Sequence, residues 1–445
     1  MRKHGLFDSR VPRYTSYPTA NHFDGSIGPV EMAGFLGAVA PGSQVSLYLH
    51  IPFCRRLCWF CACRTQGTAT AAPVQAYVET LKREIALIRE QLPDDVSLSR
   101  LHWGGGTPTL LDAPVIADLA ATIADAFRLA EGAEFSVEID PNEIDDVRLD
   151  ALAAAGLTRA SIGVQDFNPD IQSIIGREQG FDITKRAVDG LRARGIESLN
   201  VDILYGLPSQ TKANISDSVQ RVLSLTPDRV ALYGYAHVPW MARRQAMIPT
   251  DLLPRPEDRL ILFDTAARLF RWDGYVDIGI DHFAREDDGL AKAAASKSLR
   301  RNFQGYTDDT AEVLIALGAS SISKFPGGFA QNQPATSKWS AAINSGAFAT
   351  SRGIAITDDD RLRGAAIEML MCEFGIDFAR LAERSQAKIN DAETLVLPLL
   401  ETFPDAIDRV EGGISIRSEA RPLTRIIARA LDAWDVKSAG HSLAI

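Results

Sequence analysis

Residues 46–66, SLYLHIPFCRRLCWFCACRTQ, contain four of the five cysteines of this 445-residue chain. Cys54, Cys58, Cys61 and Cys63 are spaced C-x3-C-x2-C-x-C, directly after the half-apolar run 46–51. That run predicts a strand that ends in a loop. Thiolates this close together repel one another unless a positively charged centre holds them. The spacing therefore predicts bound zinc, an iron–sulfur cluster or disulfides.

The three alternatives suit one short loop unequally. Disulfides suit it least, because residues 1–8 are polar without an apolar signal segment and Cys372 has no obvious mate. Zinc usually takes two separated pairs of ligands, which four cysteines on one loop match poorly. A cluster fits better, because Cys54, Cys58 and Cys61 can bind three of its corners and leave one iron open for chemistry.

The composition excludes several classes of function. The hydrophobic content of 46% supports a sizeable core, and no apolar run is long enough to cross a bilayer. A net charge of −10 argues against general binding of nucleic acid or of anionic membranes. Reduced thiols without an export signal indicate the cytoplasm.

The first half of the chain alternates predicted strands with predicted helices. The strands are expected at residues 46–51, 98–103, 135–140, 159–165, 199–205 and 229–234, with helices such as 183–193 and 215–225 between them. This order predicts a parallel sheet with right-handed crossovers. The expected fold class is α/β, a partial (β/α)6 TIM-like barrel whose reactive end is formed by the carboxyl ends of the strands.

Three parts are expected along the chain. They are an N-terminal arm at residues 1–37, a catalytic domain at 38–345 and a smaller, mostly helical domain at 346–445. In the last part we expect helices at 362–372, 392–403 and 421–434, the second broken at Pro398. The sequence PRYTSYP in the arm suits an extended segment, either a surface strap or a lid over a site.

Polar residues on the predicted strands suggest a cofactor site. Glu138 and Asp202 alternate with apolar residues, and acidic groups on an inward strand face are costly without partners. A cationic, hydroxyl-bearing cofactor would supply such partners. The triplet Gly104, Gly105 and Gly106 directly follows a strand, where glycine allows a backbone to approach a ligand closely.

The spacing of the first three cysteines resembles the radical S-adenosylmethionine superfamily. The surrounding sequence resembles one family within it, the oxygen-independent coproporphyrinogen III oxidases of haem synthesis. The segments that carry this resemblance are PRYTSYPTA (12–20), YLHIPFC (48–54), HWGGGTPT (102–109), GVQDFN (163–168), YGLP (205–208), DHFAR (281–285), RNFQGYT (301–307) and, more weakly, MCEF (371–374).

The resemblance implies a [4Fe–4S] cluster on Cys54, Cys58 and Cys61, and two molecules of S-adenosylmethionine. The residues at the family's cofactor-contacting positions are Tyr48, Phe60, Cys63, Gly105, Gly106, Thr107, Glu138, Gln165, Arg177, Asp202, Ala236 and Ile322. It also implies that Arg13 in the arm lies near the substrate.

The resemblance further implies the reaction. The reduced cluster splits S-adenosylmethionine, the resulting radical takes a hydrogen from a propionate, and carbon dioxide leaves. Two such events turn coproporphyrinogen III into protoporphyrinogen IX. An unidentified electron donor, a monomeric chain and no nucleic-acid or membrane partner are expected. The substrate carries four carboxylates, so it needs a local cationic pocket.

Two other functions remain open on the same scaffold: a haem-binding chaperone and a radical tetrapyrrole methyltransferase. Cys63 and the PRYTSYP arm favour the oxidase, because the related chaperone-like proteins usually lack this fourth cysteine. Ala62 departs from the pattern, since many family members have glycine between the last two cysteines.

Overall fold

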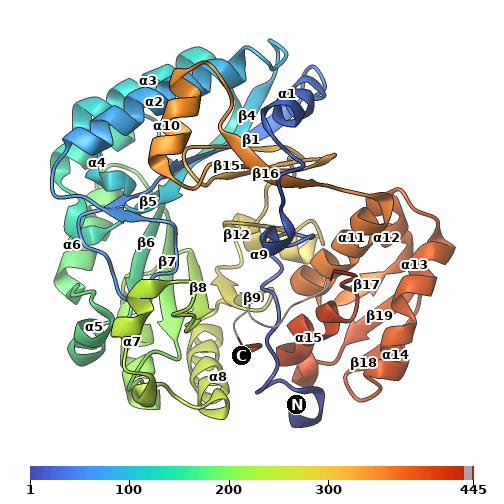
Figure 1. The fold of residues 1–445 in the computed structure, drawn as a ribbon. Helices are drawn as coiled ribbons and strands as arrows, with labels where there is room; N and C mark the ends of the chain where they lie inside the picture. The colour runs from blue at the N-terminus through green and yellow to red at the C-terminus, as the bar shows by residue number, and fades with distance from the viewer. Residues whose placement is uncertain (435–442) are drawn as a thin grey trace.

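A twelve-stranded sheet forms the centre of the molecule (Figure 1). The computed structural model describes residues 1–434 and 443–445 of the chain. Its strand order is β16-β15-β14-β13-β1-β4-β5-β6-β7-β8-β10-β9. The six strands from β1 to β8 in that order are parallel neighbours. They are β1 (Gln44–Ile51), β4 (Ser97–Gly105), β5 (Arg128–Ile139), β6 (Arg159–Gln165), β7 (Ser198–Tyr205) and β8 (Arg229–Gly234). All six predicted strands and the partial (β/α)6 barrel are confirmed.

The sheet continues beyond this parallel core at both edges. Strand β13 (Leu314–Leu317) pairs in parallel with β1, and β14 (Ile322–Phe325), β15 (Gly328–Asn332) and β16 (Thr350–Ala355) follow antiparallel. At the other edge, β10 (His282–Ala284) and β9 (Val276–Ile278) are also antiparallel. Strand β16 therefore extends the large sheet past residue 345, where the helical part was expected to begin.

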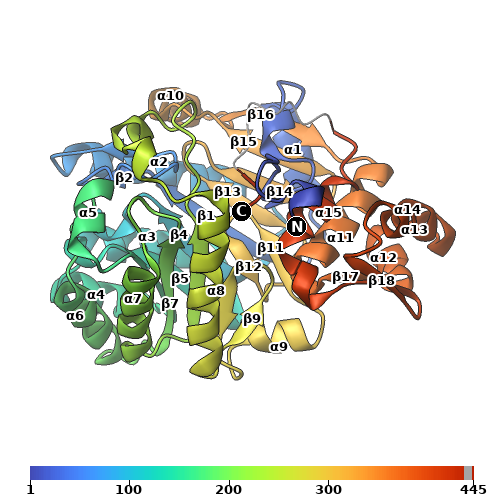
Figure 2. The same cartoon turned by 90° about the horizontal axis from the view of Figure 1, so that it is seen from below.

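Helices cover the outer face of the sheet (Figures 1 and 2). Those that follow the parallel strands are α2 (Ala72–Arg89), α3 (Ala113–Ala126), α4 (Asp146–Ala154), α5 (Pro169–Ile175), α6 (Phe181–Arg192), α7 (Lys212–Ser224) and α8 (Pro256–Trp272). Helix α2 shows why they pack there: Pro73 fits its first turn, and Val74, Val78 and Leu81 recur on one buried face. The amphipathic face and the alternating strands together form one core.

Shorter elements complete the barrel region. The helices are α1 (Pro29–Gly37), α9 (Gly289–Ala295) and α10 (Thr336–Asn344), and the strands are β2 (Phe53–Cys54), β3 (Gln66–Gly67), β11 (Arg300–Asn302) and β12 (Gly305–Thr307). The 3-10 turns are η1 (Arg2–His4), η2 (Ala20–His22), η3 (Pro108–Leu110), η4 (Pro141–Glu143), η5 (Arg243–Met247), η6 (Thr250–Leu252) and η7 (Ser418–Leu423).

The C-terminal part lies beside the barrel (Figure 2) and has its own core. Its helices are α11 (Asp358–Glu373), α12 (Phe378–Ser385), α13 (Ile389–Val396), α14 (Pro398–Thr402) and α15 (Thr424–Arg429). A small sheet, β17 (Gly375–Asp377), β19 (Gly413–Ile416) and β18 (Ile407–Val410), packs with them. The predicted break at Pro398 is confirmed.

The predicted single helix over 421–434 is wrong. Residues 418–423 form the 3-10 turn η7, and the α-helix spans only Thr424–Arg429. Pro422 lies inside the 3-10 turn, and because proline has no amide hydrogen it cannot continue an α-helical ladder.

The N-terminal arm runs between the barrel and the C-terminal part (Figure 1). Leu6, Val11, Tyr14 and Tyr17 are buried in the C-terminal core. The Tyr14 hydroxyl donates a hydrogen bond of 3.0 Å to Asp432, which fixes the arm on that side. The arm is therefore a buried strap. None of the described helices is long and apolar enough to cross a membrane.

Candidate active site

The cysteine loop leaves the carboxyl end of β1, at the edge where β4 to β8 also end. Strands β2 and β3 pair in parallel, Phe53 with Gln66 and Cys54 with Gly67, so they close the base of the loop. This closure holds residues 55–65 as one compact loop over the sheet edge. Sequence reasoning missed these two-residue strands, because such short segments carry no periodicity.

The loop cysteines are all free thiols: Cys54, Cys58 and Cys61 are half-buried and Cys63 is exposed. Burial raises the pKa of Cys54 to about 11, although a hydrogen bond with Thr107 opposes the shift. Burial also raises the pKa of Cys58, against the effect of Arg177. A hydrogen bond from Cys63 lowers the pKa of Cys61. The charge of Cys61 raises the pKa values of Cys54 and Cys58, and a bound positive centre would relieve this repulsion.

The donor set suits a cluster better than a single ion. Cys54, Cys58 and Cys61 are three free thiols on one loop that is closed at its base. Structural zinc sites usually take four ligands. The three thiols of a cubane cluster bind different irons and instead surround it. Cys54, Cys58 and Cys61 therefore fit a [4Fe–4S] group.

The glycine triplet after β4 packs directly against the start of the cysteine loop. The Gly106 amide donates to Ile51 O (2.9 Å), and the Thr107 amide donates to Phe53 O (2.7 Å). A Cβ atom on Gly106 would lie 2.5 Å from Phe53 O. Gly105 has a φ of +110°, which favours glycine. The glycines are thus needed for the close approach of two backbones.

Glu138 lies at the end of β5 and faces the same mouth. It accepts a hydrogen bond of 2.9 Å from the Gly105 amide, and one oxygen lies 3.5 Å from Nε2 of His102. Loss of hydration raises the pKa of Glu138, but His102 and Gly105 outweigh this effect and hold the pKa below its ordinary value. Glu138 is therefore ionised and fixed in position.

Asp202 on β7 has the opposite pKa shift. Burial raises its pKa to about 6, the negative charge of Glu138 adds to the rise, and a hydrogen bond of 2.8 Å from Asn200 opposes it. The two carboxylates are thus close enough to interact while they keep different proton affinities. This arrangement suits a cationic ligand between them.

Tyr48 and the histidines beside it form one polar group at the mouth. The Tyr48 ring stacks on His102 with 5.6 Å between centroids, and its hydroxyl lies 3.0 Å from Nδ1 of His50. Nε2 of His50 lies 3.1 Å from Arg64 O on the cysteine loop. Burial lowers the pKa of His50. Both histidines lie in segments that carry the family resemblance, 48–54 and 102–109, and the structure makes them supports of the site.

Arg177 reaches the cysteine loop from the segment after α5. Its guanidinium donates to Gly163 O (2.7 Å) and to Gln179 (2.8 Å), and lies 3.6 Å from Sγ of Cys58. The guanidinium also forms an ion pair of 3.4 Å with Asp140. Gln165 ends β6 with a φ of +71°.

Phe60 and Ala236 are joined by a residue that the sequence did not reveal. The side-chain amide of Gln245 donates to Phe60 O (2.7 Å) and to Ala236 O (3.0 Å). Gln245 is buried in the 3-10 turn η5, which carries no sequence motif, so only the fold could reveal its role. Ile322 begins β14 where β13 ends, at the same edge of the sheet.

Comparison with known proteins agrees with this geometry. Residues 48–222 match the model of the Radical SAM superfamily. The fold and the cysteine loop thus define a radical S-adenosylmethionine enzyme.

Full-length similarities narrow the assignment. The chain is 59% identical over 444 residues to the oxygen-independent coproporphyrinogen III oxidase of Paracoccus denitrificans, covering 99% of this chain and 98% of that protein. It is 39% identical over 427 residues to the Escherichia coli protein of the same name, covering 95% and 93%. The solved structure of coproporphyrinogen III oxidase from Escherichia coli, a radical SAM enzyme, superimposes with a TM-score of 0.89 at 36% identity, over 95% of this chain and 97% of that one. The chain belongs to the oxygen-independent coproporphyrinogen III oxidase family.

Proposed function

We propose that this enzyme converts coproporphyrinogen III to protoporphyrinogen IX in haem biosynthesis by oxygen-independent oxidative decarboxylation. The observation that carries the proposal is a three-cysteine loop at the carboxyl edge of a partial barrel, in a chain similar to such oxidases over its whole length. Two propionates become vinyl groups in this reaction, each with loss of carbon dioxide.

The cluster ligands in this proposal are Cys54, Cys58 and Cys61. When bound, the cluster and S-adenosylmethionine supply the one-electron chemistry by which a propionate loses hydrogen and carbon dioxide. Arg177 fixes Cys58 through the contact to its sulfur, and the paired strands β2 and β3 hold the loop at its base. These contacts fix the loop at the carboxyl edge of the sheet.

The proposed residues for S-adenosylmethionine surround the mouth described above. Glu138 and Asp202 provide negative charge for its sulfonium and amine groups, and the backbone after β4 approaches its polar end. The full proposed set is Tyr48, Phe60, Cys63, Gly105, Gly106, Thr107, Glu138, Gln165, Arg177, Asp202, Ala236 and Ile322. We propose that it serves two molecules, because the set extends from Ile322 beside β13 to Ala236 after β8.

Further aspects of the function belong to the same proposal. An electron donor not yet identified reduces the cluster, and the chain acts as a monomer in the cytoplasm without a nucleic-acid or membrane partner. Residues 1–37 form the arm, and the catalytic and helical parts meet after β16, ten residues beyond the boundary expected at residue 345.

The test is anaerobic reconstitution followed by product analysis with coproporphyrinogen III, S-adenosylmethionine and a reductant. Replacing Cys54, Cys58 or Cys61 by alanine should abolish cluster absorbance and protoporphyrinogen formation together. Cys372→Ala is the matched control, since Cys372 is a buried thiol outside the loop. Full decarboxylation by any loop variant would refute the proposal. Methyl transfer or stable haem uptake without decarboxylation would instead support the alternative functions.

A further inference from the structure

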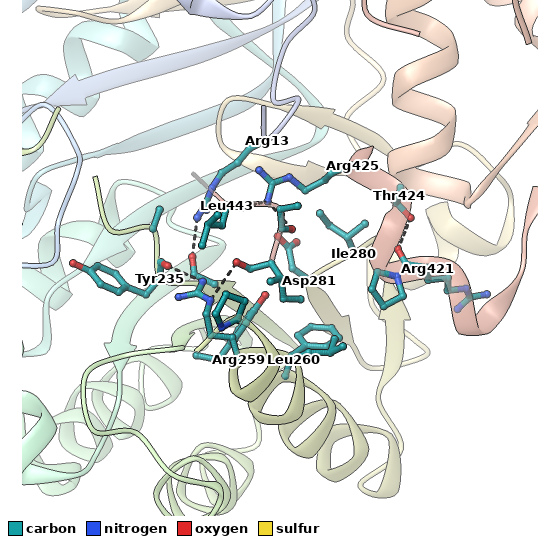
Figure 3. A pocket seen from close by; sticks show the side chains of 18 of the residues that line it. Arg13, Tyr235, Arg259, Leu260, Ile280, Asp281, Arg421, Thr424, Arg425 and Leu443 are labelled. Atoms are coloured by element: carbon teal, nitrogen blue, oxygen red, sulfur yellow. Dashed lines mark hydrogen bonds between the residues drawn. The ribbon is translucent and has the colours of Figure 1, made fainter. Parts of the chain in front are cut away.

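A cavity of about 920 Å³ lies between the mouth of the barrel, helix α8, the N-terminal arm and the C-terminal part (Figure 3). Its wall includes Gly234, the last residue of β8, and the two residues that follow it, Tyr235 and Ala236. Ala236 also belongs to the proposed cofactor set, so the cavity adjoins the proposed site of chemistry. Seven arginines and four acidic residues line it, an excess of positive charge in a chain whose net charge is −10.

Four of these arginines form a group that we call the arginine cradle: Arg13, Arg259, Arg301 and Arg425. Three of them are labelled in Figure 3. They come from the arm, from helix α8, from β11 and from helix α15, so four distant parts of the sequence supply one positive surface.

The cradle makes its hydrogen bonds mainly to neutral carbonyl oxygens. Arg13 donates to Gly234 O (2.7 Å), and Arg259 donates to Tyr235 O (2.7 Å) and to Gly206 O (3.5 Å). Arg425 donates to Leu443 O (3.2 Å) and to three other carbonyls. Backbone carbonyl oxygens therefore occupy the hydrogen-bonding positions around these guanidinium groups. A carboxylate oxygen in the same position would bind an arginine more strongly than a carbonyl oxygen does.

Arg301 has donors left over. Its side chain is only 8% exposed, yet its Nε and Nη1 atoms have no hydrogen-bond partner in the described chain. The guanidinium lies 4.4 Å from the centre of the Tyr306 ring, and its Nη2 donates to Arg13 O at 3.4 Å. Buried charged donors without acceptors are costly. An acceptor supplied by a ligand would remove that cost.

The cradle has little countercharge. Within the described residues none of its four members forms an ion pair with a side-chain carboxylate, although Asp281 is near enough to interact with Arg13, Arg301 and Arg425. Asp281 is already bonded to Nδ1 of His282 at 2.7 Å. Burial lowers the pKa of Arg425 to about 9, and the positive charge of Arg13 lowers it further. Added negative charge would therefore stabilise this cluster.

We propose that the arginine cradle binds the propionate carboxylates of the substrate that are not undergoing reaction. The inference rests on the proposed function and names the groups that recognise its substrate. A macrocycle held at one side by charge-assisted bonds would extend past Ala236 toward the proposed cofactor site. Arginine suits this role because its planar fork binds both oxygens of a carboxylate.

The experiment uses the full-length, anaerobically reconstituted enzyme and the variants Arg13→Gln and Arg425→Gln. We would measure KM for coproporphyrinogen III and Kd for coproporphyrin III, its unreactive oxidised form, with the uncharged tetramethyl ester as the second probe. Arg255→Gln is the matched control, since this exposed arginine precedes α8, pairs with Asp258 and does not line the cavity. Iron content and S-adenosylmethionine affinity are recorded for every variant.

We expect each cradle variant to raise KM and the coproporphyrin Kd about tenfold or more, because each loses a charge-assisted bond. Arg425→Lys should recover part of that loss, and binding of the ester should not respond. Unchanged KM and Kd in folded Arg13→Gln, whose side chain is exposed, would overturn the inference. If coproporphyrin binding depends on the cradle arginines but no protoporphyrinogen forms, only the proposed function is refuted. If the cradle variants turn over normally with an unchanged KM, only the cradle proposal is refuted.

Discussion

Glu138 and Asp202 show how the fold prepares two carboxylates of one site for one ligand. His102 and the Gly105 amide favour ionised Glu138, whereas burial and the charge of Glu138 favour protonated Asp202. A cation placed between them would lower the pKa of Asp202 and gain binding energy from doing so. Strand alternation placed both residues in the site from sequence, but the difference between them depends on neighbours from other strands.

Asp202 gives the affinity for S-adenosylmethionine a pH dependence. Its pKa of about 6 is raised above the ordinary value, so below pH 6 it is protonated in the free enzyme and its negative charge is lost. We expect affinity to increase as pH rises from 5 to 7, with a midpoint near 6, and to level off above. Equilibrium dialysis of the reconstituted enzyme would measure this profile. The Asp202→Asn variant should bind S-adenosylmethionine weakly, with an affinity that does not change across this pH range. An equally steep pH profile in that variant would contradict the assignment.

Arg177 should set the reduction potential of the cluster. Its contact to the Cys58 sulfur favours the more negative, reduced state, since hydrogen bonds to cluster ligands raise the potential. Arg177→Met should therefore lower the midpoint potential in an anaerobic titration followed by electron paramagnetic resonance. Arg192→Met is the control, because Arg192 contacts only the segment at Leu225 and Thr226. An unchanged potential in the Arg177 variant would show that this contact does not reach the cluster.

Elements with strong periodicity could be predicted from sequence, and weakly periodic elements could not. Strands β6 and β8 lie at the predicted residues, because burial alternates along β6 and β8 contains the apolar run Val230–Leu232. The edge strands β13 to β16 span only four to six residues and could not be distinguished from loops. The cysteine loop was evident because its spacing is local. The arginine cradle could not be found from the sequence, because its members are up to 412 positions apart and converge only in the fold.

The turn after β4 should tolerate no side chain. In Gly106→Ala the added Cβ would meet the Phe53 and Ile51 carbonyls, so the backbones of the turn and the cysteine loop must separate. We expect a loss of about 1–3 kcal/mol in the free energy of unfolding and poor retention of the cluster, measured by denaturation and iron content. Gly34→Ala, in an open position of helix α1, should be neutral or stabilising. Full iron content in Gly106→Ala would contradict the close packing.

At the scale of the whole molecule, the arm connects two separate cores. Its residues Leu6, Val11, Tyr14 and Tyr17 are buried with the C-terminal helices, while the exposed Arg13 reaches Gly234 at the end of β8. The arm thus places one member of the cradle against the barrel. The sequence left open whether the arm was a strap or a lid, because an extended segment has no pattern that identifies its neighbour.

Loosening the arm should destabilise the C-terminal part. Tyr14 is 4% exposed and bonded to Asp432, so Tyr14→Ala should lower the free energy of unfolding by about 3–5 kcal/mol. Hydrogen exchange should then increase in α11 and α15 more than in β4 and β5. Thr15→Ala, at the neighbouring position, is the control. Equal exchange in both cores would mean that the arm does not hold the C-terminal part in place.

The most direct test of the central claim is the product formed by the anaerobically reconstituted enzyme from coproporphyrinogen III, with S-adenosylmethionine and a reductant. The account predicts that the enzyme forms protoporphyrinogen IX and two molecules of carbon dioxide per substrate. The Cys58→Ala variant should lose this activity entirely, and the Cys372→Ala variant should retain it. A wild-type enzyme with an intact cluster that leaves all four carboxylates in place would contradict it.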